Sequence, residues 1–405
     1  MSLQATADQA LVRRLNTSLI VECLRSRGPL SRANLSDETG LSRSTVSSLI
    51  NALLEKGFVR EIGLETPGRG RPGILLELDP KGGSAVGVEI GVDFISIVLT
   101  DFIAQVLWRQ RVVSNPDDEQ GVIFERAEEL IQQALAVGGQ HDLQCLGIGV
   151  GVPGLVNAQQ GTLVFAPNLA WRKVPVRDKW TRRFHLPIFV ENEANAAALG
   201  EFCFGVAQDV QNLIYLSAGF GLGAGIIIEG QLFCGSGGYA GEVGHMTMDP
   251  NGELCGCGKH GCWETIVGPR AIARRARKAL QDNKDSHIYT LVDGDLSHID
   301  VNTVIQAAEA GDPVARNALR ETGVQLGIGI GNLVNAFNPQ MVVLGGALSS
   351  ASPFIMPVIE KVVQKHALPQ PYESLEIAAS AHGADACVMG GVALVLDDVL
   401  AEPML

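Results

Sequence analysis

The sequence predicts a mixed α/β protein of two or three domains, with a small helical head at its N-terminus. Two observations favour this fold class. Glycine reaches 47 residues while aromatic residues make up only 5%, which suits strands joined by glycine turns better than a β-sandwich. Apolar residues make up 46% and charged residues 19%, so a chain of 405 residues can build sizeable cores.

Residues 1–80 are expected to begin with three helices. Ser31 and Ser42 are suited to cap the second and third helices, and Gly40 can end the second helix in the left-handed conformation. Apolar side chains in the third helix recur at i, i+3, i+4, i+7 and i+8, and predict one buried stripe. The stripe consists of Val46, Leu49, Ile50, Leu53 and Leu54.

A hairpin is expected to follow the helices. Residues 58–62 and 74–78 are rich in apolar side chains and are separated by a stretch with four glycines and two prolines. Three helices followed by such a hairpin are typical of a winged helix-turn-helix domain, which binds DNA through its third helix and its wing.

The polar face of the third helix predicts the contacts with DNA. Short hydrogen-bonding side chains and one arginine suit base edges and phosphates in a major groove. The predicted contacts are Ser42, Arg43, Ser44, Thr45, Ser47, Ser48 and Asn51. The alternative is an ordinary solvated face, which every surface helix has.

The tip of the wing reads "PGRGRP" and resembles the core of an AT-hook. Its glycines allow the backbone to come close to DNA, and its prolines keep the segment extended. Arg69 and Arg71 are therefore predicted to enter an A·T-rich minor groove, where negative potential is concentrated. A solvated loop is the alternative.

The distribution of charge is consistent with local contact with DNA. The net charge of −13 argues against a protein that coats nucleic acid indiscriminately. Residues 1–80, however, hold 10 basic and 9 acidic side chains, a net of +1, which leaves −14 for the rest. An apolar run of about 18 residues and the layout of a signal peptide are both absent from the sequence, and we expect a cytoplasmic protein without membrane contact.

After Asp79–Pro80 the sequence alternates apolar strands with glycine turns. Residues 85–101 and 212–233 read as hairpins, and residues 145–157 as a buried strand that leads into a loop. Residues 188–201 read as a strand followed by a helix, and residues 340–348 as a late strand. This pattern predicts the α/β body.

One motif in the body predicts a metal site. In "GEVGHMTMDPNGELCGCGKHGCWE", one histidine and three cysteines offer the nitrogen and thiolate ligands that tetrahedral zinc prefers. They are His245, Cys255, Cys257 and Cys262. Four protein ligands close the coordination sphere, so we expect a structural Zn²⁺. Reduced thiols without a metal are the alternative, and His260 is expected to be a surface residue.

The order of these segments resembles the ROK family, which joins repressors and sugar kinases on an actin/hexokinase-like, two-lobed fold. The resemblance extends from about residue 83 to the end. The head and the motif "ENEAN" are most similar to the family's xylose-repressor-type branch. The resemblance implies a DNA-binding domain at 1–80 and a first lobe at 81–191, which is completed by a helix at about 388–405. It also implies a second lobe at 192–387 that holds the zinc site. A sugar would bind between the lobes.

The resemblance also implies the residues that hold the sugar. In family kinases an Asn and an Asp of "ENDAN", the Glu and His of "GExGH" and the Glu that closes the zinc motif hold the sugar hydroxyls. Here the matching positions, with a further match in "APNLAW", are Asn168, Asn192, Glu193, Glu242, His245 and Glu264. Taken singly, each could be an ordinary polar residue at a helix start or in a loop.

Departures from the kinase motifs predict that phosphoryl transfer has been lost. The first phosphate loop, "DxGGT" in kinases, reads Glu89–Asp93 here, with valine in place of a glycine and an acidic residue in place of threonine. The second, "GTGxGGG", carries Phe220 in the threonine position. The catalytic Asp is replaced by Glu193, one methylene longer, which displaces a base by about 1 Å.

These features together predict a sugar-responsive transcriptional repressor of carbohydrate-metabolism genes that is not an enzyme. A homodimer or tetramer would bind an inverted repeat in double-stranded DNA, and a small sugar such as xylose or glucose would modulate that binding. One alternative is an active ATP-dependent sugar kinase of the ROK family that carries a DNA-binding head. Another is a repressor that is released by a protein partner.

Overall fold

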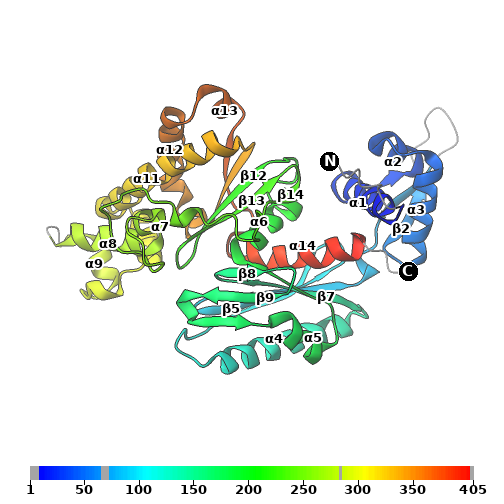
Figure 1. The fold of residues 1–405 in the computed structure, drawn as a ribbon, viewed down its shortest axis with the longest axis horizontal. Coiled ribbons are helices and arrows are strands. Elements are labelled where there is room, and N and C mark those ends of the chain that lie inside the picture. Colours follow the sequence, from blue (N-terminus) through cyan, green and yellow to red (C-terminus); the bar gives the residue numbers. More distant parts are fainter. Residues whose placement is uncertain (1–8, 65–72, 282–284, 402–405) are drawn as a thin grey trace, which may run out of the picture. The chain divides into compact units, whose positions relative to one another are not determined.

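The computed structural model describes residues 9–64, 73–281 and 285–401 (Figure 1). Contacts divide the chain into two compact units. The first consists of residues 1–150, 175–190 and 391–405, and the second of residues 151–174 and 191–390. The chain passes between them within strand β7 (Cys145–Val152), between Val174 and Pro175, within strand β11 (Ile188–Asn192) and within helix α14 (Ala386–Ala401). The predicted lobe limits, 81–191 and 192–387, stay predictions. The predicted first lobe included residues 151–174, whereas the contacts group these residues with the second unit.

The head, in the first unit, contains the three predicted helices and the hairpin (Figure 1). The helices are α1 (Gln9–Arg27), α2 (Arg32–Thr39) and α3 (Arg43–Glu55). The strands are β1 (Leu30–Ser31), β2 (Val59–Leu64) and β3 (Ile74–Leu78), in the order β1-β3-β2.

Local side-chain chemistry sets the helix ends in the head, as the sequence predicts. The Ser31 hydroxyl accepts the N–H of Asn34, and the Ser42 hydroxyl accepts the N–H of Thr45. Gly40 ends α2 with φ of 70°, in the left-handed region that glycine adopts without strain. Four of the five apolar residues of α3 are buried, and Leu54 is half-buried. The wing tip, with Arg69 and Arg71, lies outside the described residues.

The body of the first unit is built on a five-stranded sheet with the order β11-β7-β4-β5-β6. Its other strands are β4 (Ser84–Ile90), β5 (Phe94–Asp101) and β6 (Val106–Val113). Figure 1 shows α4 (Gln120–Gln140) and α5 (Val176–Phe184) on one face of this sheet and α14 on the other. Because both faces are covered, β4 is buried along its whole length and β5 along nearly all of it.

The second unit is built on another five-stranded sheet, with the order β14-β13-β12-β15-β16. These strands are β12 (Leu213–Ala218), β13 (Leu222–Ile228), β14 (Gln231–Leu232), β15 (Met341–Gly346) and β16 (Glu376–Ala379). A smaller sheet has the order β10-β9-β8, with β8 (Leu155–Asn157), β9 (Thr162–Ala166) and β10 (Trp171–Val174). The predicted hairpin at residues 212–233 is thus β12 and β13, paired antiparallel.

Helices supply most of the core of the second unit. They are α6 (Glu193–Phe204), α7 (Trp263–Val267), α8 (Pro269–Leu280), α9 (His287–Leu291), α10 (Val301–Glu309), α11 (Pro313–Phe337), α12 (Ala347–His366) and α13 (Pro369–Glu373). The largest buried side chain in the core of the second unit is Trp263. Its indole N–H donates to the carbonyl of Gln325 at 3.2 Å. Within the described part of the chain, the helices are too short or too polar to cross a membrane.

Candidate metal and ligand sites

The four predicted metal ligands of the second unit come together. His245 ends the short helix η3 (Val243–His245), and the three cysteines lie between η3 and the start of α7. Their ligand atoms all lie within 4.8 Å of one another. The Sγ atom of Cys255 is 3.6 Å from Nδ1 of His245, and the Sγ atoms of Cys257 and Cys262 are also 3.6 Å apart. His260 is exposed, as predicted.

The two 3.6 Å spacings fit a tetrahedral metal ion. Zinc lies about 2.3 Å from sulfur and about 2.05 Å from nitrogen, which places two tetrahedral sulfurs about 3.8 Å apart and a sulfur and a nitrogen about 3.6 Å apart. Burial raises the pKa of the Cys255 thiol, which donates to Oε1 of Glu264 at 2.7 Å. A bound cation would supply the positive charge that stabilises a buried thiolate. The cluster could therefore hold a metal ion.

Carboxylates flank the same histidine. The Nε2 atom of His245 lies 3.8 Å from Oε2 of Glu242, and its Nδ1 lies 3.7 Å from Oε1 of Glu264. Glu193 is the first residue of α6, and burial together with the Glu242 carboxylate raises its pKa to about 7. Burial also raises the pKa of Glu242, with opposing effects from His245 and Glu264. Four of the six predicted sugar ligands thus form one polar cluster.

Asn192 has a second role at this site because it caps α6. Its Oδ1 accepts the N–H groups of Ala194 and Asn195 at 2.8 and 3.2 Å, and its Nδ2 donates to the carbonyl of Gly154 at 2.9 Å. These bonds fix the start of the helix that carries Glu193. Asn168 is exposed in the short helix η2 (Pro167–Leu169), directly after β9.

Two residues that the sequence interpretation left without a role support the start of α6. The buried carboxylate of Glu191 accepts the N–H of Asn192 at 2.8 Å and the side-chain amide of Asn195 at 3.0 Å. Burial raises the pKa of Glu191. Glu191 and Asn195 both belong to "ENEAN", so the motif itself pointed to a role for them at this site. Their contacts could not be predicted from their spacing.

The glycine turn between β12 and β13 lies against the carboxylate cluster. A Cβ atom at Gly221 would lie 2.4 Å from Oε2 of Glu264, so only glycine leaves that carboxylate in place. The neighbouring Phe220 ring is 5.0 Å from the guanidinium carbon of Arg270. In the other turn, between β4 and β5, Val92 is 5% exposed. Both turns therefore present an apolar side chain where the kinase motifs have glycine or threonine.

The predicted DNA-reading residues lie on α3 or at its cap. Arg43, Ser44, Ser48 and Asn51 are exposed, as is the cap Ser42, while Thr45 and Ser47 are half-buried. Arg32, at the start of α2, was not among the predicted contacts, but it touches one of them. Its guanidinium donates to Oδ1 of Asn51 at 3.3 Å and lies 3.4 Å from Oε1 of Glu61.

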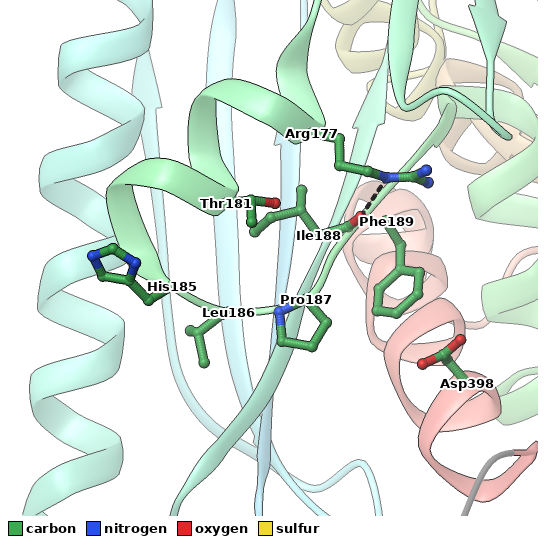
Figure 2. Close-up of a pocket in the computed structure, with 8 residues that line it drawn as sticks. All are labelled: Arg177, Thr181, His185, Leu186, Pro187, Ile188, Phe189 and Asp398. Carbon is green, nitrogen blue, oxygen red and sulfur yellow. Dashed lines mark hydrogen bonds between the residues drawn. The ribbon is translucent and has the colours of Figure 1, made fainter. Parts of the chain in front are cut away.

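A separate cavity of about 720 Å³ opens in the first unit (Figure 2). It is lined by Arg177, Thr181, His185, Leu186, Pro187, Ile188, Phe189 and Asp398. Figure 2 shows the Arg177 side chain beside Ile188, where its Nε donates to the carbonyl of Ile188 at 2.9 Å. This cavity contains none of the predicted sugar ligands.

Comparison with known proteins identifies relatives of both parts of the chain. A model described as "IclR helix-turn-helix domain" matches residues 16–63. The xylose repressor of Caldicellulosiruptor bescii is 35% identical over 396 residues, which cover 98% of this chain and 99% of that protein. A solved ROK family transcriptional regulator, described as a homolog of the E. coli MLC protein, has a TM-score of 0.81 at 27% identity and covers 96% of this chain and 97% of its own.

The body alone also resembles sugar kinases. A ROK family glucokinase from Streptomyces griseus, solved with glucose and AMPPNP, has a TM-score of 0.69 at 33% identity. It covers 77% of this chain and 99% of its own. The fold class expected from the sequence, a ROK body with an N-terminal helix-turn-helix domain, is confirmed. The model described as "ROK family" matches residues 85–398, and the chain therefore belongs to the ROK family.

Proposed function

We propose that this protein is a sugar-responsive transcriptional repressor of carbohydrate-metabolism genes, which binds operator DNA through its head. One observation carries the proposal. The C. bescii xylose repressor aligns with 98% of the chain, head and body together, whereas the S. griseus glucokinase aligns with only 77% of it. The helix-turn-helix domain that sets the chain apart from the glucokinase is the part that a repressor needs.

The carboxylate cluster around His245 is the centre of the proposed sugar site. The six residues proposed to hold the sugar are Asn168, Asn192, Glu193, Glu242, His245 and Glu264, of which the last four form the cluster. Carboxylates and amides accept and donate hydrogen bonds to neighbouring hydroxyls, which suits a small polyol. Three carboxylates in or beside one site disfavour an anionic ligand. A neutral sugar such as xylose or glucose therefore fits this site best.

A structural zinc ion at His245, Cys255, Cys257 and Cys262 would support the sugar site. Zinc supplies no reaction here: with four protein ligands it would only fix the loop. That loop carries His245 at one end and leads into α7, which carries Glu264, at the other. Loss of the ion would free both sugar ligands at once.

Operator binding would use the polar face of α3 and the wing. The proposed contacts are Ser42, Arg43, Ser44, Thr45, Ser47, Ser48 and Asn51 on the helix, and Arg69 and Arg71 on the wing. A homodimer or tetramer would place two heads on the half-sites of an inverted repeat. Sugar would change operator affinity by binding more tightly to one arrangement of the chain than to another.

A titration of operator binding tests the proposal. A duplex selected by the full-length protein from a random-sequence pool would serve as operator, and its dissociation constant would be measured with D-xylose, D-glucose, L-arabinose or no sugar. We expect one sugar to weaken binding about 5-fold to 150-fold, the usual range of coupling between two sites. A response to none of the sugars would contradict the sugar-responsive part and favour release by a protein partner. Failure to select any duplex would contradict the repressor itself.

An active sugar kinase is the second candidate, because the body resembles a glucokinase. Phe220, Val92 and Glu193 argue against it, since they alter both phosphate turns and the base. We expect no sugar-dependent ATP hydrolysis by the unmodified protein. Turnover at about 1 s⁻¹ or faster, within the range of kinases, would support the kinase instead. The variant that combines Glu193→Asp with Phe220→Thr restores the kinase residues at both positions. Turnover in this variant would show that Glu193 and Phe220 are sufficient to abolish it in the unmodified protein.

A further inference from the structure

We propose that Phe58 and Phe102 are positioning residues that couple the DNA-binding head to the sugar-binding state of the body. The proposal rests on the repressor function above. The two rings are stacked, with centroids 4.7 Å apart and planes inclined by 10°. Phe58 lies directly before β2 of the head, and Phe102 lies directly after β5 of the body sheet. Both side chains are buried, at 9% and 2% exposure.

The segment that joins head and sheet is ordered around this stack. It is the short helix η1 (Pro80–Gly82), which starts at an Asp79 cap. The N–H of Asp79 donates to the carbonyl of Phe58 at 2.9 Å, and the N–H of Phe102 donates to the carbonyl of Pro80 at 3.3 Å. A Cβ atom at Gly82 would lie 3.0 Å from the Phe102 ring. We call this set, Phe58, Phe102 and residues 79–82, the head joint.

The head joint differs from a flexible linker. A linker of five or so solvated residues would let the head turn independently of the body. Here the backbone bonds on both sides of η1 and the buried ring stack hold the end of β5 and the start of β2 together. A change in the position of β5 is therefore passed to the head, because close-packed groups move together.

The same sheet leads to the proposed sugar site. β5 is hydrogen-bonded to β4, β4 to β7, and β7 to β11. β11 ends at Asn192, the residue before Glu193, and Asn192 caps the helix that Glu193 begins. One hydrogen-bonded sheet thus connects a proposed sugar ligand to Phe102. Contiguous packing of this kind can carry coupling between two sites.

The substitution Phe102→Leu tests the proposal in the full-length protein. It keeps an apolar side chain in the core but removes the ring stack, so it should cost less stability than Phe102→Ala. The quantity measured is the ratio of operator dissociation constants with and without saturating sugar, on the duplex selected by the unmodified protein. D-xylose, D-glucose and L-arabinose are the probes. We expect the ratio to fall at least 3-fold, with sugar affinity and sugar-free operator affinity each within about 2-fold of the unmodified protein.

A second aromatic pair in the first unit provides the matched control. Phe124 of α4 packs edge-on against Trp180 of α5, with centroids 5.6 Å apart, and both side chains are fully buried. Phe124→Leu is therefore the same substitution in the same unit, away from the head joint. We expect it to lower thermal stability but to leave the ratio of dissociation constants unchanged. Phe58→Leu should reproduce the effect of Phe102→Leu, and the double variant should add little, because both remove the same contact.

The outcomes separate the two proposals. If the unmodified protein shows no ratio above 1 with any of the three sugars, the sugar-responsive part of the function proposed above fails, and coupling through the head joint fails with it. If the unmodified protein responds and Phe102→Leu responds equally, only the head joint is refuted. It is refuted as well if Phe124→Leu lowers the ratio as much, or if Phe102→Leu loses operator binding without sugar, since the stack would then be merely structural.

Discussion

His245 faces Glu242 with one ring nitrogen, Nε2, at 3.8 Å, while its other nitrogen, Nδ1, faces the Sγ atom of Cys255 at 3.6 Å. In metal sites the nitrogen of a ligand histidine that faces away from the ion is commonly held by a carboxylate. One imidazole therefore belongs both to the cysteine cluster and to the carboxylate cluster proposed to hold sugar. Removing the metal should disturb sugar binding as well as stability.

Cys257→Ser should remove the metal and weaken the fold. A serine hydroxyl is a poor zinc ligand, and structural zinc contributes directly to folding free energy. We expect the purified protein to lose about one equivalent of zinc. A loss of about 3 kcal/mol should lower the melting temperature of the second unit, which holds the cluster, by about 6–12 °C. Metal analysis by mass spectrometry and a thermal scan measure both.

Cys23→Ser is the control for this prediction. Cys23 is a half-buried cysteine in α1 and lies outside the cluster, so its replacement should leave the zinc content unchanged. Full zinc occupancy in Cys257→Ser would rule out the assignment of this thiol as a ligand.

The double change Arg69→Ala and Arg71→Ala should weaken operator binding and flatten its salt dependence. Each arginine that meets a phosphate contributes about 1 to the slope of log K against log salt, so the slope should fall by up to about 2. The loss should be larger for A·T-rich flanking sequence, where the minor groove is narrow. Binding curves at several salt concentrations provide the measurement.

Arg60→Ala is a suitable control because Arg60 lies on the same hairpin but is held by Glu77 at 2.6 Å. It should leave the slope nearly unchanged. If the slope of log K against log salt is equal in the unmodified protein, the double variant and Arg60→Ala, the arginines of the wing tip do not contact DNA phosphates.

Much of this chain could be predicted because its signals are local. Ser42 as a cap, Gly40 as a helix end and the buried stripe of α3 depend on neighbours within a few residues, and the structure confirms all three. The approach of Gly221 to Glu264 joins residues far apart in sequence, and the stack of Phe58 on Phe102 joins the head to the body sheet within the first unit. No spacing rule encodes such contacts, because packing of distant segments decides them. Asn192 shows the intermediate case: its position was predicted, but its capping bonds were not.

Stability should fall as pH rises through the acidic range, partly because of Glu193. Burial and the Glu242 carboxylate raise the pKa of this carboxyl from 4.5 to about 7. The folded protein then holds the proton more tightly than the unfolded chain does. This contribution is fully present below pH 4.5 and is lost as pH rises to about 7. We expect a loss of about 1–3 kcal/mol in the free energy of unfolding between pH 5 and pH 8.

Glu193→Gln isolates this contribution because an amide does not titrate. Denaturant unfolding at pH 5, 6, 7 and 8 should give a shallower fall with pH in the variant than in the unmodified protein. Equal slopes would contradict the raised pKa. The variant also reports on the site, since sugar binding that depends on the protonated carboxyl should become independent of pH in this range.

Gly221→Ala should weaken sugar binding without unfolding the protein. Its Cβ would lie 2.4 Å from Oε2 of Glu264, the free end of a flexible side chain, which can move aside at little cost. Displacement of that carboxylate removes a proposed sugar ligand, and we expect sugar affinity to fall about 10-fold, or about 1.4 kcal/mol. Gly219→Ala, in the same turn, is the matched control, because a Cβ there has no heavy atom within 4 Å. Calorimetric titration with the sugar that affects operator binding gives both affinities. If both variants bind as the unmodified protein does, Glu264 does not hold the sugar. If both lose affinity equally, the turn itself and not the carboxylate is what the sugar requires.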